Sequence, residues 1–245
     1  MAGFFGFFDY TKPGPGVDKD ALKKRSFFLF IDLFMRKFWK IIQLNMLYFI
    51  CCIPIVTIGP ATAGFVYVLR NFSREEHAWI ASDFFEKGFK QNFKQSFLHA
   101  LYTAILLLVL ALSDRFYRAM WKQAALTGGN TIVYAIGSAF VLIALMILTF
   151  MQPYVYLMIV TFEMKLKDIY KNALIFAVAK LPKNILVALC CVIILLPFAS
   201  YYLIGLILVP FFLLGLIGFI VVFWSYLTIE QLMIVPARVA EEIEE

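Results

Sequence analysis

Charged residues are scarce in this sequence, and long stretches of it have none. Asp, Glu, Lys and Arg make up 16% of the 245 residues, whereas apolar residues make up 63%. A soluble domain carries about 25% charged residues. The net charge of +6 could suggest nucleic-acid binding, but the basic residues sit in a few segments between uncharged runs, which is typical of membrane topology. The composition therefore predicts an integral membrane protein, with residues 1–245 as one transmembrane domain and no nucleic-acid partner.

Ionisable groups are missing from the middle of every predicted span, and only residues at span ends, such as Asp114, Glu163 and Glu230, carry a charge. Ion-coupled transporters, proton pumps and voltage sensors place such groups inside the membrane, so these classes are not expected. Walker, Gly-x-Ser-x-Gly, His-Glu-x-x-His and dinucleotide-binding motifs are also absent from the sequence. We therefore expect neither an enzyme nor a bound cofactor.

The four cysteines form two adjacent pairs, Cys51–Cys52 and Cys190–Cys191, inside apolar runs. Metal sites usually separate their thiolates by two or more residues and add His or carboxylate ligands. We expect these cysteines to be small packing residues rather than a metal or redox site.

Several uncharged runs are long enough to cross a membrane, since a spanning helix needs roughly 20 apolar residues. Residues 96–113 and 130–162 provide one span each. Residues 184–229 provide a helical hairpin with a break at 197–202, where Tyr201 and Tyr202 are expected at the interface. A further run, 41–69, is long for one span and short for two.

The basic residues decide how the chain crosses at 41–69. With one crossing, the 22 basic residues divide into eleven on each side; with two crossings, nineteen lie on one side and three, Arg115, Arg118 and Lys122, on the other. The positive-inside bias favours two crossings. We therefore predict about six membrane spans with both termini in the cytoplasm, including an N-terminal segment, 1–25, and an acidic tail, 236–245.

The turn between these two crossings is predicted near the outer face. Proline lacks a backbone donor and glycine permits tight geometry, so the turn is assigned to Pro54, Gly59, Pro60 and Gly64. The returning limb, 60–72, is short. It either spans the membrane with tilt or re-enters as a half-helix shielded by other helices.

Three segments are predicted to be amphipathic helices in the cytoplasmic interface: 26–42, 82–97 and 165–184. In 82–97, the residues Phe85, Phe89, Phe93 and Phe97 recur every four positions, opposite Lys87, Lys90 and Lys94. Such helices anchor the protein to the membrane, or one of them docks a cytoplasmic partner. The predicted fold is thus all-α: a polytopic transmembrane helical bundle with interfacial helices.

The charged stretch 70–77 precedes the second amphipathic segment and contains Arg70, Arg74, Glu75 and Glu76. Ser73 is a plausible helix N-cap, with Glu76 completing a capping box. We expect local ion pairs here, and count the four charged residues as candidates for partner docking. His99, near the start of its span, is expected to be a hydrogen-bonded interface residue rather than a proton relay.

Three motifs resemble the YesL-like family of small bacterial membrane proteins: GFFDYTKPGPGV (6–17), IPIVTIGPATAGF (53–65) and SREEHAWIASDFFEKGFKQNFKQS (73–96). Members of this family are often encoded beside sugar-uptake ABC importers and glycan-degrading enzymes. The resemblance therefore implies a link to carbohydrate import without establishing a reaction.

Residues 167–184 look like the cytoplasmic loop through which ABC importer permeases contact their ATPase, because a helix with alanines is followed by Leu-Pro. The usual glycine of that loop is missing. The corresponding docking candidates are Lys171, Asn172, Leu181 and Pro182.

Two functions follow as expectations. The first is an accessory subunit, embedded in the lipid bilayer, that binds the permease and ATPase subunits of a sugar ABC importer. The second is an independent channel or facilitator for a small solute, whose path would be lined by Gln43, Asn45, Thr57, Thr62, Thr149 and Gln152. Gly205, Gly215 and Gly218 mark a close helix contact, within one chain or between two, so the oligomeric state stays open.

Overall fold

The computed structural model describes residues 26–200 and 208–236, and within these ranges the protein is helical and has no strand. The predicted N-terminal segment, the Tyr201–Tyr202 pair and nearly all of the acidic tail lie outside the described residues. The elements are α1 (Ser26–Cys52), η1 (Ile55–Thr57), α2 (Ile58–Ser73), α3 (Ile80–Phe85), η2 (Glu86–Gln91), α4 (Phe93–Thr127), α5 (Ile132–Thr161), α6 (Leu166–Ala179), α7 (Leu181–Ser200), η3 (Val209–Leu213), α9 (Leu214–Ile229) and η4 (Glu230–Ile234).

Helix α2 is the centre of the fold. It contacts α1, α3, α4, α5 and α9, and every residue from Gly59 to Ser73 except Thr62 and Tyr67 is buried. Its first turns contain Gly59, Ala61, Ala63 and Gly64, whose small side chains let the neighbouring backbones approach closely. The short limb that the sequence left as either spanning or re-entrant is therefore shielded on all sides by other helices.

The chain turns at 53–57 and α2 runs back along α1. Near the turn, the Tyr48 and Thr62 hydroxyls lie 3.2 Å apart. Farther from the turn, Arg36 on α1 donates to Glu75, just after α2, at 3.2 Å. The two helices are therefore antiparallel neighbours. Pro54 directly precedes η1, and the Thr57 hydroxyl donates to the carbonyl oxygens of Cys51 and Pro54 at 2.6 and 2.7 Å. The turn is therefore closed by these hydrogen bonds.

Gly59, Pro60 and Gly64 do not form the turn, contrary to the prediction, because all three lie inside α2. Neither glycine has a positive φ, so neither is needed for tight backbone geometry. A Cβ at Gly59 would collide with the carbonyl oxygen of Ser96, and one at Gly64 with that of Phe84. Both glycines serve close packing of α2 against α4 and α3.

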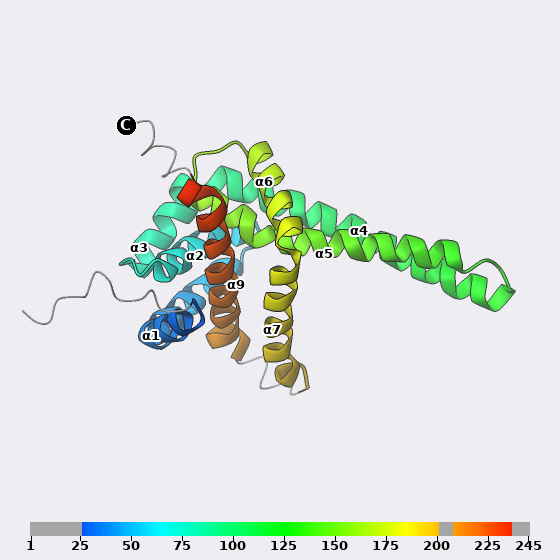
Figure 1. The fold of residues 1–245 in the computed structure, drawn as a ribbon, viewed down its shortest axis with the longest axis horizontal. Coiled ribbons are helices and arrows are strands. Elements are labelled where there is room, and N and C mark those ends of the chain that lie inside the picture. Colours follow the sequence, from blue (N-terminus) through cyan, green and yellow to red (C-terminus); the bar gives the residue numbers. More distant parts are fainter. Residues whose placement is uncertain (1–25, 201–207, 237–245) are drawn as a thin grey trace, which may run out of the picture.

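Helices α4 and α5 form a long hairpin that projects from the other helices (Figure 1). Gly128 ends α4 with φ of 70°, a left-handed value that favours glycine. Along the hairpin, Gly137 faces the ring of Tyr117 so closely that a Cβ would overlap it, and Ser138 donates to Asp114 at 3.3 Å.

Four helices in the described part of the chain are long and apolar enough to cross a membrane: Phe93–Thr127, Ile132–Thr161, Leu181–Phe198 and Phe211–Ile234. These helices indicate a membrane protein. Helices α1 and α2, which supplied the first two of the six expected spans, are not among them. Figure 1 also shows the α4–α5 hairpin running across the direction of α7 and α9, so the candidate spans do not form one parallel bundle.

The three predicted interfacial segments differ from expectation in two cases. Residues 26–42 are the first part of one continuous helix, α1, rather than a separate element. Residues 82–97 are broken at Asn92, whose backbone N–H and side-chain amide both donate to the carbonyl oxygen of Lys87, at 3.2 and 2.9 Å. In the third segment, α6 ends at Ala179 and α7 begins at Leu181, where the sequence has the Leu-Pro pair.

Candidate functional site

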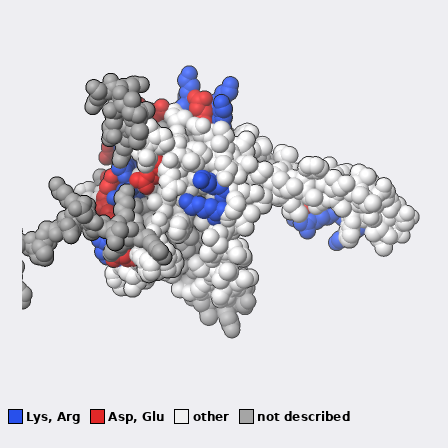
Figure 2. Space-filling view, viewed as in Figure 1, with Lys and Arg blue, Asp and Glu red and all other residues white. Residues whose placement is uncertain are grey.

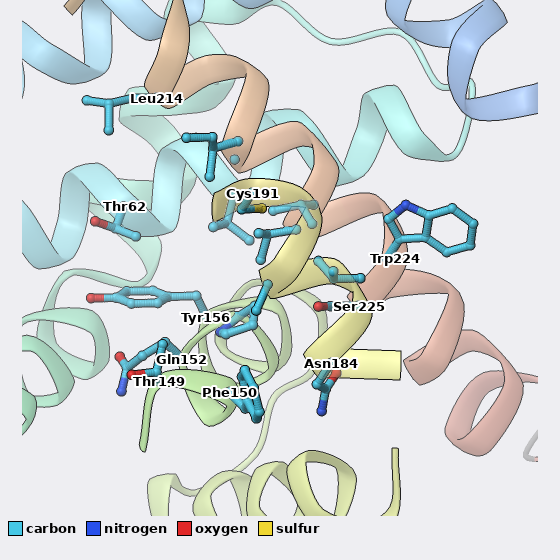
Figure 3. Close-up of a pocket in the computed structure, with 18 of the residues that line it drawn as sticks. Thr62, Thr149, Phe150, Gln152, Tyr156, Asn184, Cys191, Leu214, Trp224 and Ser225 are labelled. Atoms are coloured by element: carbon cyan, nitrogen blue, oxygen red, sulfur yellow. The ribbon is translucent and has the colours of Figure 1, made fainter. Parts of the chain in front are cut away.

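A cavity of about 520 Å³ lies between α7 on one side and α2, α5 and α9 on the other (Figure 3). Its α7 wall consists of residues three or four positions apart, which share one helix face: Lys183, Asn184, Val187, Ala188, Cys191 and Val192. Its α9 wall runs from Leu214 to Ser225. The volume falls within the range of about 300–1,000 Å³ that is usual for small-molecule sites.

Polar side chains around this cavity already have partners in the protein. Thr62 donates to the carbonyl oxygen of Ile58 at 2.7 Å and lies 3.2 Å from the Tyr48 hydroxyl. The Tyr154 hydroxyl donates to Asn184 at 2.7 Å, and the Asn184 amide donates to the carbonyl oxygen of Ala177 at 3.1 Å. The walls therefore offer few unused hydrogen-bonding groups to a ligand.

Lys183 differs from the rest of the lining because it brings a positive charge to one end of the cavity. Its Nζ atom donates to the Thr228 hydroxyl at 2.8 Å and lies 5.7 Å from the centre of the Trp224 ring. Of the ion pairs among the described residues, none involves Lys183. A half-buried cation without a carboxylate is thus placed beside apolar walls.

A second polar group, adjoining the cavity through Gln152, is centred on His99, which is 1% exposed. Gln152 donates through its amide nitrogen to the carbonyl oxygen of Leu148 at 3.2 Å, so its oxygen faces Nε2 of His99 at 3.0 Å. That oxygen only accepts hydrogen bonds, so Nε2 of His99 must carry the proton. The other ring nitrogen, Nδ1, then accepts from the Tyr170 hydroxyl at 2.7 Å.

Burial raises the pKa of Tyr170 on α6 to about 12, so its hydroxyl stays protonated and remains a donor at neutral pH. Both nitrogens of His99 are therefore satisfied by neutral groups. His99 is hydrogen-bonded, as the sequence led us to expect, and it joins α4, α5 and α6.

Arg70, a predicted docking residue, is only 7% exposed. Its guanidinium donates to the carbonyl oxygen of Val160 at 2.9 Å, to the hydroxyl of Thr161 at 3.0 Å and to the side-chain oxygen of Asn71 at 3.0 Å. It is therefore unavailable at the surface and ties α2 to the end of α5.

The neighbouring charged residues lie outside the core. Arg74 forms an ion pair with Glu76 at 2.8 Å, and Glu75 pairs with Arg36. The expected local ion pairs are present, but the capping box is not. Ser73 is the last residue of α2, where its hydroxyl donates to the carbonyl oxygen of Leu69 at 2.9 Å, and the next helix begins only at Ile80.

The phenylalanines predicted to share one helix face, Phe85, Phe89, Phe93 and Phe97, here called the Phe stripe, are only partly buried. Phe85 and Phe93 are 43% and 40% exposed, whereas Phe84, which was not part of the predicted stripe, is 0% exposed. Phe89 is half-buried and packs against the core. The remaining predicted docking residues are exposed or half-buried in two groups: Lys90 and Lys94 around the start of α4, and Lys171, Asn172, Leu181 and Pro182 on α6 and α7.

The distal part of the hairpin, residues 114–138, combines exposed apolar residues with exposed cations. Its basic side chains lie along one side of an otherwise uncharged surface (Figure 2). Exposed large side chains are Phe116, Trp121, Leu126, Ile132, Val133 and Ile136, and Arg115, Arg118 and Lys122 are exposed beside them. A hollow of about 410 Å³ lies at the tip, between Met120, Thr127, Asn130 and Tyr134.

Sequence reasoning missed the cavity and the central role of α2. Within residues 26–200 and 208–236, no group of three or more His, Cys, Asp or Glu could hold a metal ion. His99 and Gln152 are polar residues in apolar segments, which hinted at a buried hydrogen-bonded cluster. Their positions in the sequence did not indicate that their side chains meet.

The comparisons with known proteins give one match. The model of a family described as protein of unknown function DUF624 matches residues 41–113, a range that includes the second half of α1, all of α2 and α3, and the first half of α4. This family includes YesL-like proteins, which agrees with the resemblance in that region. No curated protein and no solved structure matches the chain.

Proposed function

We propose that this protein is an accessory subunit of a carbohydrate ABC import system in the bacterial cell membrane. It would bind the importer's membrane-spanning permease and its ATPase, with both termini in the cytoplasm, and catalyse no reaction. The α4–α5 hairpin carries this proposal, and the resemblance of 53–65 and 73–96 to YesL-like proteins supplies the kind of partner.

The hairpin supports a binding role because each of its two helices packs against the other on one side and leaves apolar side chains exposed on the opposite side. Along α4, the residues Leu101, Leu108 and Leu112 are 48–61% exposed, and on α5 Phe140 is 69% exposed. Both helices are candidate spans, so either lipid or another membrane protein covers this surface. The hairpin extends outward from the other helices (Figure 1), in a position to pack against another membrane protein.

The distal part of the hairpin is the surface best suited to such a contact. Trp121 and Phe116 are 46% and 57% exposed, and Arg118 lies on the same helix, held by Asp114 at 2.7 Å. Aromatic and arginine side chains are the residues that contribute most to protein interfaces. The cytoplasmic docking candidates Lys90, Lys94, Lys171 and Pro182 would form a second contact.

Gentle purification from the native membrane tests the proposal. We expect permease and ATPase subunits to be recovered with the unaltered protein and to be lost with the double variant Phe116→Ala, Trp121→Ala. The double variant Leu101→Ala, Leu108→Ala removes comparable exposed apolar surface from the proximal part of the hairpin and serves as the control. Equal recovery with both variants would contradict docking through the distal part, and recovery of neither subunit with the unaltered protein would contradict the function.

The alternative is an independent channel or facilitator for a small solute, and the cavity is the observation that favours it. Of the six polar residues proposed for a path, Thr62, Thr149 and Gln152 line the cavity. All three donate hydrogen bonds to carbonyl oxygens of their own helices, so they form no continuous polar wall. Solute flux into liposomes that contain this protein alone would support the alternative over the accessory subunit.

A further inference from the structure

The cavity beside α7 is long and narrow rather than round. Its lining extends along α7 from Lys183 to Val192, which at about 1.5 Å per residue is roughly 13 Å. On α9 it extends from Leu214 to Ser225, roughly 16 Å by the same rise. Figure 3 shows Asn184 and Leu214 at opposite ends of this space, with Cys191 between them.

The two ends of the cavity differ in chemistry. Lys183 reaches Thr228 and Trp224 on α9, so the start of α7 faces the last turns of α9. The polar end of the cavity lies there and is lined by Lys183, Asn184 and Ser225. Towards the other end the lining is mostly apolar, with Val192, Leu214 and Ile217, and the hydroxyls of Tyr48 and Thr62 pair with each other. An occupant that fits both ends has an apolar chain and a polar head.

The charge of Lys183 selects the sign of that head. Its Nζ atom has a hydroxyl and an aromatic ring as partners but no carboxylate among the described residues. Lys180, three positions earlier, adds a second positive charge nearby, so the local field attracts anions. A half-buried cation gains most from a charge-assisted hydrogen bond to an anionic oxygen.

The remaining walls suit hydrocarbon better than a sugar. The polar side chains Tyr48, Thr62 and Gln152 are engaged with each other, with His99 or with backbone carbonyl oxygens. A sugar would leave buried hydroxyl groups without hydrogen-bond partners, which weakens its binding. A hydrocarbon chain has no such groups and gains from every buried methylene.

We propose that this cavity binds one acyl chain of an anionic membrane phospholipid, with the headgroup phosphate on Lys183. The membrane supplies such molecules directly, since α7 is a candidate span. The lipid would join α7, which contacts only α6 and α9 closely, to α2 and α5 across the cavity.

Native mass spectrometry of the full-length protein, delipidated in mild detergent, tests this site. We expect phosphatidylglycerol to bind more tightly than phosphatidylcholine with the same chains. Lys183→Met should abolish this headgroup preference, weakening phosphatidylglycerol binding about tenfold, as loss of one charge-assisted hydrogen bond implies. Lys122→Met, which removes a cation from the hairpin, is the matched control and should leave the preference unchanged.

A second pair of variants tests the apolar part of the cavity. Ala188→Trp places a large ring inside it and should weaken binding of both phospholipids, whereas Leu186→Trp on the exposed face of α7 should not. Variants are compared only at equal thermal stability. Should Ala188→Trp not fold, Val192→Trp takes its place at the apolar end.

Two results with the variants would overturn the proposal. One is an unchanged headgroup preference in Lys183→Met. The other is equal lipid binding by the cavity-filling variant and by Leu186→Trp. Tighter binding of palmitate than of phosphatidylglycerol would also contradict it, because the occupant would then be a free fatty acid rather than a phospholipid.

Discussion

The guanidinium of Arg70 lies 2.9 Å from the carbonyl oxygen of Val160, ninety residues further along the chain. This hydrogen bond and the one to Thr161 link the buried helix α2 to the end of the hairpin, close to the loop that leads into α6. A residue whose sequence context suggested surface docking thus holds two parts of the core together.

Arg70→Met should lower the stability of the protein. The change leaves the buried carbonyl oxygen of Val160 without its donor, which costs about 1–3 kcal/mol. The measurement is thermal unfolding in mild detergent, followed by tryptophan fluorescence. Arg74→Met, which breaks only the partly exposed pair with Glu76, should cost at most about 1 kcal/mol. Equal losses in the two variants would refute the structural role of Arg70.

Gly64→Ala should destabilise the contact between α2 and α3, because its new methyl group would collide with the backbone of Phe84. Overpacking of this kind costs about 1–3 kcal/mol. Gly129→Ala is the control, since the nearest atom to its Cβ would be 3.7 Å away, and exposed changes of this kind stay within about 0.5 kcal/mol. Unfolding in detergent compares the two, and a harmless Gly64→Ala would contradict the tight packing described for α2.

His99 should be neutral, with its proton on Nε2. Nitrogen-15 NMR of histidine-labelled protein reports the tautomer, and a proton on Nδ1 or a doubly protonated ring would be inconsistent with the bonds to Gln152 and Tyr170. Tyr170→Phe removes the donor to Nδ1 and should cost about 1–3 kcal/mol of stability. Tyr102→Phe, at a ring that is 51% exposed, should have little effect.

The membrane topology should place Lys122 outside the cell and Lys90 and Lys171 inside. Single cysteines at these positions, in a protein whose four native cysteines are replaced, are exposed to a membrane-impermeant thiol reagent. Labelling is expected at Lys122 alone in intact cells and at all three positions after the membrane is opened. External labelling at Lys90 would refute the pair of crossings at 41–69 and the cytoplasmic position of the docking candidates.

The helices themselves follow from local sequence, whereas their arrangement does not. Apolar length predicted the helices of the hairpin, α7 and α9. Figure 1 shows the hairpin running across the direction of α7. The sequence could not predict this angle, because the number of apolar residues in a helix does not determine its orientation. The burial of α2 was hidden for a similar reason: its small residues indicate close contact but not which helices make it.

The Phe stripe shows how a regular spacing can mislead. Repeats every four residues from Phe85 to Phe97 favour one helix, but the helix is interrupted at Asn92, whose backbone N–H and side-chain amide both donate to the carbonyl oxygen of Lys87. The ring that packs fully into the core is therefore Phe84. Asparagine competes for backbone hydrogen bonds in this way, so Asn92 was the residue in the sequence that could have signalled the break.

The central position of α2 also sets an order of events during synthesis. Helix α2 leaves the ribosome before α4, α5 and α9, which surround it in the folded protein. Chains grow at roughly 5–20 residues per second, so Arg70 must wait roughly 5–20 seconds before Val160, ninety residues later, has been made. During that interval the guanidinium of Arg70 lacks its two acceptors on α5. The contacts that bury α2 are complete only after α9 has been made.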